Sequence, residues 1–336
     1  MMGGQHDAVV GSLWTRVCTS SSPNGAIQSR VVRRTQAAVP KCGPPGAKSG
    51  LTAMWAVLVM RGLFDNLDAM RASEGSVERR REVKALVDAV VANIEAGRAV
   101  ERPFFHLEFE RVFPDDIYAK MIAAMPAAAD YRPLPGRNKG NLREDGTSTR
   151  VKIDLFPEYI RHLAPDKLPV WDMVGRALCS EEVQATFGRR LAPGLERRFG
   201  KNFAAVGMYP IPVLTRDIPG YRITPHTDTQ WKGMTVQLYL PRDASATHIG
   251  TIFHERLPDG SLPKATQMKF APNTGYAFAV GDNTWHSADP VGAEVETRDS
   301  ILLTYFVDAG LLRILRNRGK RVGNFLLSEV KHLVRR

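Results

Sequence analysis

From residue 221 to residue 240 the chain reads YRITPHTDTQWKGMTVQLYL, and from residue 298 to residue 306 it reads RDSILLTYF. Both stretches are rich in β-branched and aromatic residues and are bounded by turn-forming residues, a pattern typical of short strands. Five further segments of this kind lie between residues 203 and 308: AAVGMYPI, GTIFHE, TQMKFAP, GYAFAV and NTWHSAD. The first stretch contains two such segments, YRITPHTD and GMTVQLYL, so the total is eight, and eight short strands close most simply as two four-stranded sheets. The sequence therefore predicts a mainly β protein with a jelly-roll core (a double-stranded β-helix, as in cupins) and flanking helices.

Residues 71–202 predict a mixed, largely helical part that precedes this core and packs on it. Apolar residues at helical spacing, followed by Gly97, predict a helix over 76–96. We expect a second helix from Pro114 to about Ala124, because proline favours the first helical turn, and a third over 168–188.

A strand and a loop complete this part. Residues 105–110 alternate apolar and polar, which predicts a half-buried strand with His106 and Glu108 on the solvent side. The polar stretch GRNKGNLREDGTST at 136–149 predicts a mobile loop. Its composition motivates the hypothesis that this loop folds as a lid over a site in the β core.

The positive charge is concentrated at the two ends of the chain. The formal net charge is +11, with six Lys/Arg and one Asp in residues 1–50 and eight Lys/Arg and one Glu in residues 311–336. The body between them is close to neutral. We expect residues 1–70 to be a disordered extension and residues 309–336 to be a basic C-terminal helix or tail. Solvated ends, with no nucleic-acid partner, are the preferred interpretation, and a nucleic-acid or anionic-membrane contact is the alternative.

The cysteine content and hydropathy favour a cytoplasmic protein. Three cysteines without a CxxC pair form neither a disulfide framework nor a cysteine zinc site. The apolar run 54–60 is too short to span a bilayer, and no signal peptide is recognisable. A transit peptide or a misassigned start, with Met70 as the alternative, would also explain the first residues.

A group of metal-binding side chains is predicted inside the jelly roll. Residues i and i+2 of a strand point to the same face, so His226 and Asp228 can both face the interior. His286 follows 58 residues after Asp228, on a strand that jelly-roll order can bring beside the first. Two histidines and one carboxylate form the facial triad of a non-haem Fe(II) site with open positions. Taken singly, His226 and Asp228 would be interpreted as a surface turn and His286 as a core histidine. His106-x-Glu108 has the same His-x-acid pattern but no matching partner residues, so it is not a candidate.

In this combination the sequence resembles the 2-oxoglutarate- and Fe(II)-dependent oxygenases. His-x-Asp and a distant His are followed, twelve residues after His286, by Arg298-x-Ser300. The phrases MYP, GYRITPHTD, TVQLYLP and RDSILLTYF are most similar to the prolyl-hydroxylase-like branch. The resemblance covers roughly 203–308, with weaker similarity at 103–126.

The resemblance implies an enzyme that uses Fe(II), 2-oxoglutarate and O2, with ascorbate as a candidate reductant. It would hydroxylate an unactivated C–H bond and release succinate and CO2. The implied metal ligands are His226, Asp228 and His286. Arg298 would bind the distal carboxylate of 2-oxoglutarate through a bidentate ion pair. The other implied co-substrate residues are Tyr239, Tyr209, Ser300 and, more weakly, Thr235.

Departures from the family pattern leave the substrate open. The segment GTIFHE replaces a Gly-Gly element of the prolyl hydroxylases, and His254 in it is interpreted as structural. No proline-binding signature is recognisable. We expect an unidentified small-molecule or peptide substrate, and the oligomeric state is open. The alternatives are a cupin-like metal-binding or sensor protein without turnover, a nucleic-acid-associated protein, and a metal-dependent hydrolase, which would not need Arg298 and Ser300.

Overall fold

A computed structural model describes residues 75–134 and 140–308. The predictions for residues 1–70 and 309–336 lie outside the described residues, as do residues 136–139 of the predicted lid loop. Within the described ranges, no helix is long and apolar enough to cross a membrane.

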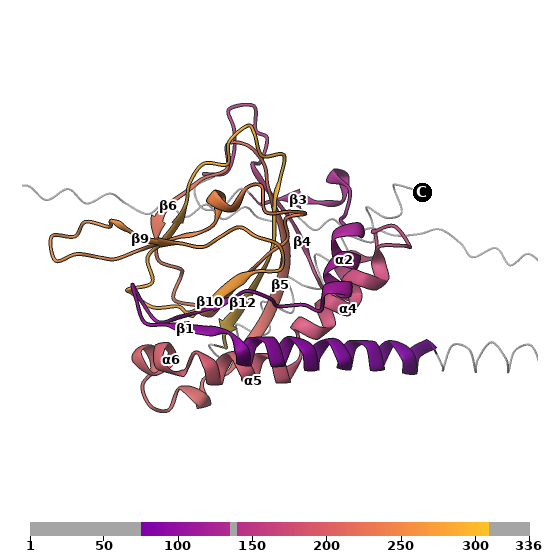
Figure 1. The fold of residues 1–336 in the computed structure, drawn as a ribbon, viewed down its shortest axis with the longest axis horizontal. Helices are drawn as coiled ribbons and strands as arrows, with labels where there is room; N and C mark the ends of the chain where they lie inside the picture. The colour runs from indigo at the N-terminus through magenta and orange to yellow at the C-terminus, as the bar shows by residue number, and fades with distance from the viewer. Residues whose placement is uncertain (1–74, 135–139, 309–336) are drawn as a thin grey trace, which may run out of the picture. The chain divides into compact units, whose positions relative to one another are not determined.

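The predicted jelly roll is confirmed by the order of the strands. All eight predicted segments form strands, and these strands are divided between two sheets (Figure 1). Within each sheet, neighbouring strands pair antiparallel. One face of the barrel is the row β10-β7-β12-β5, and the other is the sheet β6-β11-β8-β9. The core strands are β5 (Met208–Asp217), β6 (Ile223–His226), β7 (Lys232–Tyr239), β8 (Ile252–His254), β9 (Lys264–Gln267), β10 (Gly275–Ala279), β11 (His286–Ala288) and β12 (Arg298–Val307).

The larger sheet continues beyond the jelly roll at both edges. The strands β2 (His106–Phe109) and β1 (Arg98–Val100) add to the β10 edge. At the other edge, β4 (Arg150–Asp154) pairs with β5 and is followed by β3 (Arg132–Pro133). Only β2 of these four strands is predicted by the sequence pattern.

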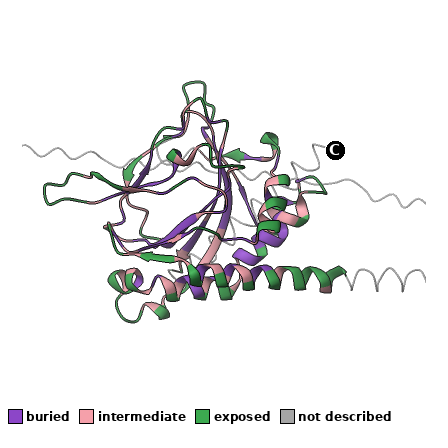
Figure 2. Cartoon of the chain, viewed as in Figure 1, coloured by how far each residue is buried: buried purple, intermediate pink, exposed green. Residues whose placement is uncertain are grey.

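Helices cover the outer face of the larger sheet (Figures 1 and 2). The predicted helix 168–188 is two helices, because the chain leaves helical geometry at Ser180, whose side chain then caps the next helix by accepting from the Val183 N–H. The helices are 75–96, α2 (Asp115–Ala123), α3 (Pro157–Ile160), α4 (Leu168–Leu178), α5 (Glu181–Arg190) and α6 (Ala192–Phe199), with 3-10 turns η1 (Ala128–Asp130), η3 (Phe203–Ala205) and η4 (Thr247–Ile249).

Alternation along the strands separates two cores. On β12, Ile301, Leu303 and Tyr305 pack outward against the helices, and this apolar burial is the main driving force for docking the helices on the sheet. The opposite face of the larger sheet looks into the barrel, where an aromatic cluster around Phe253 and Tyr276 fills the space between the sheets. The interior face therefore combines apolar packing with the polar side chains of the site.

The interpretation of His106 as a solvent-side residue is wrong. Its side chain is fully buried, with Nδ1 2.8 Å from the Phe104 carbonyl oxygen and its ring 4.8 Å from that of Phe253. The reason is the position of β2 between β1 and β10, which turns its polar face toward the inter-sheet core. Glu108 is partly exposed and contacts His106 Nε2 at 3.2 Å.

Candidate metal centre

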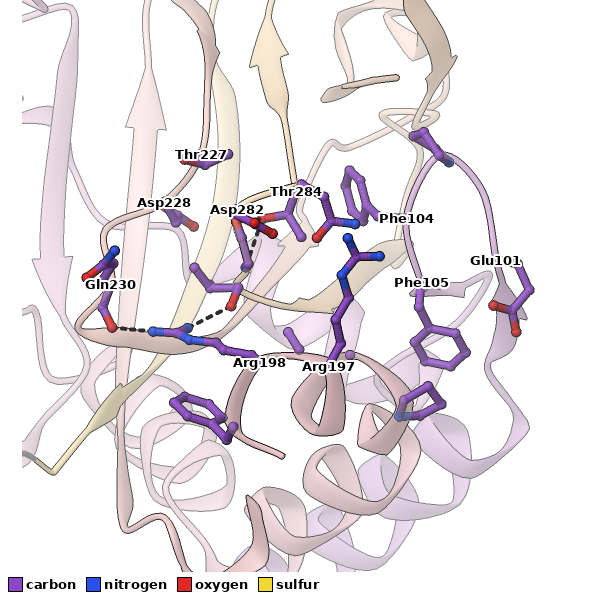
Figure 3. Close-up of a pocket in the computed structure, with 18 residues that line it drawn as sticks. Glu101, Phe104, Phe105, Arg197, Arg198, Thr227, Asp228, Gln230, Asp282 and Thr284 are labelled. Carbon is purple, nitrogen blue, oxygen red and sulfur yellow. Dashed lines mark hydrogen bonds between the residues drawn. The ribbon is translucent and has the colours of Figure 1, made fainter. Parts of the chain in front are cut away.

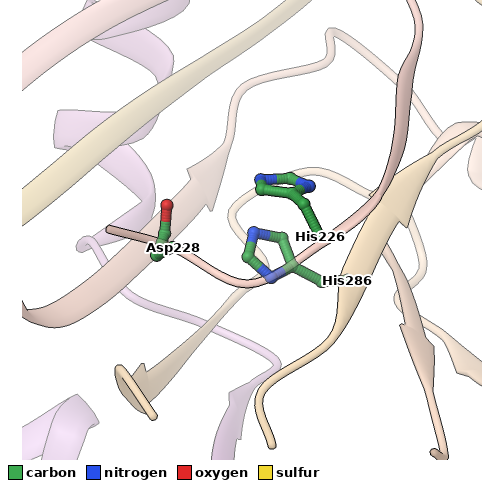
Figure 4. A group of neighbouring side chains, drawn as sticks. All are labelled: His226, Asp228 and His286. Carbon is green, nitrogen blue, oxygen red and sulfur yellow. The ribbon is translucent and has the colours of Figure 1, made fainter. Parts of the chain in front are cut away.

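Two neighbouring strands of the smaller sheet bring the predicted triad together. Strand β6 ends at His226, and β11 begins at His286, which is its register partner. Asp228 follows two residues later in the connection to β7, so the strand ends earlier than the spacing suggested. One ligand atom from each of the three side chains lies within 4.8 Å of the others (Figure 4). Among the described residues, this is the one group of three that can hold a metal ion.

Backbone carbonyls orient both imidazoles in the same way. Nδ1 of His226 lies 3.0 Å from the carbonyl oxygen of Thr224, and Nδ1 of His286 lies 3.0 Å from that of Thr284. Since a carbonyl can only accept, each Nδ1 carries the proton and each Nε2 keeps its lone pair. This is the outer-shell contact that fixes the tautomer of a metal-ligating histidine.

The charge states suit a cation. Burial lowers the pKa of His286 to about 4, against the opposing effect of Asp228, so this imidazole is neutral at physiological pH. Burial alone would raise the pKa of Asp228, but Lys232, His286 and the Thr235 hydroxyl outweigh it and hold that pKa well below its usual range. Lys232 Nζ is 2.6 Å from Oδ1, and Thr235 donates to Oδ2 at 2.7 Å. A metal needs its ligands deprotonated in this way.

The triad opens into a pocket of about 690 Å³ that also contains Arg298. Arg298 is 1% exposed at the first position of β12, and its Nη1 donates to Asp217 Oδ2 at 3.0 Å. Arg150 binds the same carboxylate through Nε at 2.5 Å and Nη2 at 2.8 Å. Two guanidinium groups thus share one carboxylate, and Arg298 Nε has no hydrogen-bond partner within the described part of the chain. One carboxylate for two buried guanidinium groups leaves one positive charge in excess, and a buried charge is costly unless it is paired.

Of the remaining predicted co-substrate residues, one lines this pocket and three do not. Thr235 lines it, beside Asp228. Tyr239 does not line it: its hydroxyl donates to Thr251 Oγ1 at 3.0 Å and accepts from the Thr251 N–H at 2.9 Å. Ser300 is fully buried and bonded to Thr215 and Gln237. Tyr209 stacks on Phe306 with ring centroids 5.8 Å apart and is also outside the pocket lining.

Tyr276 is a pocket residue that the sequence analysis missed. Its hydroxyl donates to Gln237 Oε1 at 2.7 Å and lies 3.0 Å from the Thr251 hydroxyl, Oγ1. Thr251 also lies 3.4 Å from Arg298 Nη2, so it joins the tyrosine and the arginine at one end of the pocket. The alternation of aromatic residues with alanines in GYAFAV is the signal that could have identified Tyr276 as inward-facing.

Arg198 of α6 was also missed, and it lies behind Asp228 (Figure 3). Its Nη1 donates to the carbonyl oxygens of Val280, at 2.7 Å, and Lys232, and its Nη2 donates to that of Gln230. One side chain thereby fastens the segment that follows Asp228 to the end of β10. It borders a cavity of about 850 Å³ into which the neighbouring Arg197 points. No sequence motif marks either arginine.

The fold is a jelly roll, and two imidazoles and one carboxylate within it could hold a metal ion. No family model matches the chain, and no curated protein matches it. Similar solved structures include a Pseudomonas putida prolyl-4-hydroxylase, with 16% identity and a TM-score of 0.39, covering 67% of this chain and 100% of that one. A 2OG-Fe(II) oxygenase family oxidoreductase from Burkholderia pseudomallei has 15% identity and a TM-score of 0.38, covering 66% and 89%.

A prolyl hydroxylase from Trichoplax adhaerens, solved with a peptide of hypoxia inducible factor, has 10% identity and a TM-score of 0.39, covering 68% of this chain and 91% of that one. These structures carry the names of the class that the sequence resembles. Because the identities and TM-scores are low, the function proposed below depends on the geometry of the site itself.

Proposed function

We propose that the protein is an Fe(II)- and 2-oxoglutarate-dependent oxygenase that hydroxylates an unactivated C–H bond, with release of succinate and CO2. The observation that carries the proposal is the shared pocket: the triad of His226, Asp228 and His286 and the buried, incompletely paired Arg298 face the same space. A hydrolytic metal site would have no use for the buried arginine.

The triad fits Fe(II). Two neutral imidazoles and one carboxylate are the donor set of non-haem iron sites, and they leave one face of the metal open. His226 and His286 would bind through Nε2, held by the carbonyls of Thr224 and Thr284. Asp228 would bind through one oxygen while Lys232 and Thr235 keep it ionised and oriented. When bound, the metal supplies the oxidising power, drawn from O2 and the decarboxylation of 2-oxoglutarate.

The opposite end of the pocket fits a carboxylate. Arg298 presents a buried guanidinium whose Nε is unpaired among the described residues, and Asp217 fixes its orientation. The hydroxyls of Thr251 and Tyr276 converge on the same end and can donate to an anion. We infer that these groups bind the distal carboxylate of 2-oxoglutarate and place its keto-acid end toward the triad.

The test is an anaerobic titration of the protein with Fe(II) and then 2-oxoglutarate, following the visible metal-to-ligand charge-transfer band. The wild type should form the band. In Arg298→Gln the affinity for 2-oxoglutarate should fall about 100-fold, since charged hydrogen bonds contribute roughly 1.5–3 kcal/mol each, while Fe(II) binding is unchanged. Aerobic succinate release, with ascorbate present, then tests turnover.

Arg216→Gln is the matched control. Arg216 pairs with Asp299 on the same two strands at 2.7 Å, but it does not line the pocket. Its loss should leave the band unchanged. Absence of the band in folded wild-type protein would contradict the proposal, and a band without succinate release across a substrate panel would favour a metal-binding protein without turnover.

A further inference from the structure

We infer that the substrate of this pocket is an anion, a small molecule with a carboxylate or phosphate group on an apolar body. The inference rests on the proposed function and names the substrate class for the same site. It comes from the charges that line the pocket and from the way they are paired.

Positive side chains outnumber negative ones on the pocket wall. Four of its lining residues are cations and one, Asp228, is an acid. Lys232 is matched by Asp228 at 2.6 Å. The four cations are Arg150, Arg222, Lys232 and Arg298.

Among the described residues, one further carboxylate pairs with the lining cations from behind the wall. Asp217, which is 0% exposed, pairs with both Arg150 and Arg298. Arg222 is exposed and forms no ion pair with any described residue. Four cations against two carboxylates leave the empty pocket with a surplus of two positive charges.

The cofactors do not remove this surplus. Fe(II) brings two positive charges and 2-oxoglutarate brings two negative ones. The loaded pocket therefore keeps the same surplus of two positive charges as the empty one. A cleft lined by one sign of charge concentrates ligands of the opposite sign and speeds their association. A cationic substrate would meet repulsion here, and a neutral one would leave the surplus unmatched.

The exposure of the cations separates two anion positions. Arg298 is 1% exposed and marks the deep end, where the co-substrate carboxylate is proposed to bind. Arg222 is exposed and directly precedes β6, the strand that carries His226, so it lies at the rim close to the metal ligands. We assign Arg222 as the residue that pairs with the anionic group of the substrate.

The wall beside the cations is apolar, which indicates the rest of the substrate. Trp231 lines the pocket and is 46% exposed, which makes it the more exposed of the two exposed large hydrophobic residues among the described residues. An exposed aromatic side chain at a pocket rim is a typical contact for an apolar ligand. Ile223, Leu302 and Phe306 complete this part of the wall.

The experiment compares matched probes on protein loaded with Zn(II) and N-oxalylglycine, which stand in for Fe(II) and 2-oxoglutarate without turnover. The probes are 3-phenylpropionate, 3-phenylpropyl phosphate and the neutral 3-phenylpropanamide, with dissociation constants from ligand-observed NMR. Wild-type protein should bind at least one anionic probe about tenfold or more tighter than the amide. Arg222→Gln should abolish that preference, and Trp231→Leu should weaken all three probes alike.

Arg242→Gln is the control, because it removes the same charge from an exposed arginine outside the pocket lining. It should leave the preference intact. Equal binding of the amide, no binding of any probe, or a preference that survives Arg222→Gln would each overturn the inference. The tighter of the two anionic probes identifies carboxylate or phosphate as the recognised group.

Loading is measured first, by calorimetry with Zn(II) and then N-oxalylglycine. Failure of either to bind contradicts the proposed function. Normal loading without an anion preference contradicts only the substrate class.

Discussion

Replacing Arg198 by glutamine should lower both the stability of the protein and its affinity for a metal ion. The guanidinium donates to the carbonyl oxygens of Gln230, Lys232 and Val280, and a shorter, neutral amide can retain at most one of these contacts. Two lost charge-assisted hydrogen bonds, partly replaced by water at this half-buried position, correspond to about 2–4 kcal/mol. For a domain of this size that is a fall in Tm of roughly 5–12 °C.

The metal affinity should fall as well, because the segment that Arg198 holds begins next to Asp228. Loss of outer-shell support typically costs about 10- to 100-fold in metal affinity. We would measure it by titration with Co(II), whose visible spectrum reports the ligand geometry without turnover. Tm is followed in parallel by circular dichroism.

Arg197→Gln is the natural control, since it removes the same charge from the adjacent residue of α6, which is exposed and points into the neighbouring cavity. It should change neither Tm nor Co(II) affinity appreciably. The reasoning is refuted if Arg198→Gln lowers Tm but binds Co(II) with wild-type affinity and spectrum, because the arginine would then support the fold and not the site.

Three further outcomes are expected. In Asp217→Asn, the guanidinium groups of Arg150 and Arg298 lose their shared partner, so the free energy of unfolding in urea should fall by roughly 3–5 kcal/mol; a loss under 1 kcal/mol would mean that solvent already screens the pair. The pKa of His286 is lowered to about 4 in the folded state. The unfolded chain therefore binds more protons between that value and the ordinary histidine pKa of about 6.5, and the metal-free protein should lose stability as the pH falls through this window, by up to roughly 3 kcal/mol; His286→Gln should flatten the dependence, and an unchanged profile would contradict it. Tyr276→Phe should weaken 2-oxoglutarate binding about fivefold, through loss of one hydroxyl contact near Arg298, without changing Fe(II) affinity in the same titration; an equal loss of both affinities would point to a structural role.

The jelly roll could be predicted because each of its strands has a recognisable local sequence pattern. Each segment between residues 203 and 308 carries its own alternation and its own turn residues. The break at Ser180 was missed in the single helix predicted over 168–188, although Ser-Glu-Glu is a helix start signal. The burial of His106 was not, because it depends on β10 and the aromatic cluster, which are distant in the sequence.

The residues of the site also divide into those that local sequence identifies and those that depend on distant contacts. The triad follows from the short spacing between His226, at the end of β6, and Asp228, and from a resemblance in the sequence. Asp217 and Arg198, in contrast, act through contacts with residues that are tens of positions away. Position matching identified Tyr239, whose hydroxyl bonds Thr251, but not Tyr276, which lines the pocket.

The pairing of Arg150, Asp217 and Arg298 places one residue of each of three adjacent strands in a single row across the sheet. Arg150 belongs to β4, which lies outside the eight-stranded barrel. The electrostatic character of the pocket is thus set partly by an accessory strand. Substitutions on that strand can retune which ligands the protein accepts while the barrel and its metal ligands stay untouched, which makes β4 a natural place for divergence and for redesign.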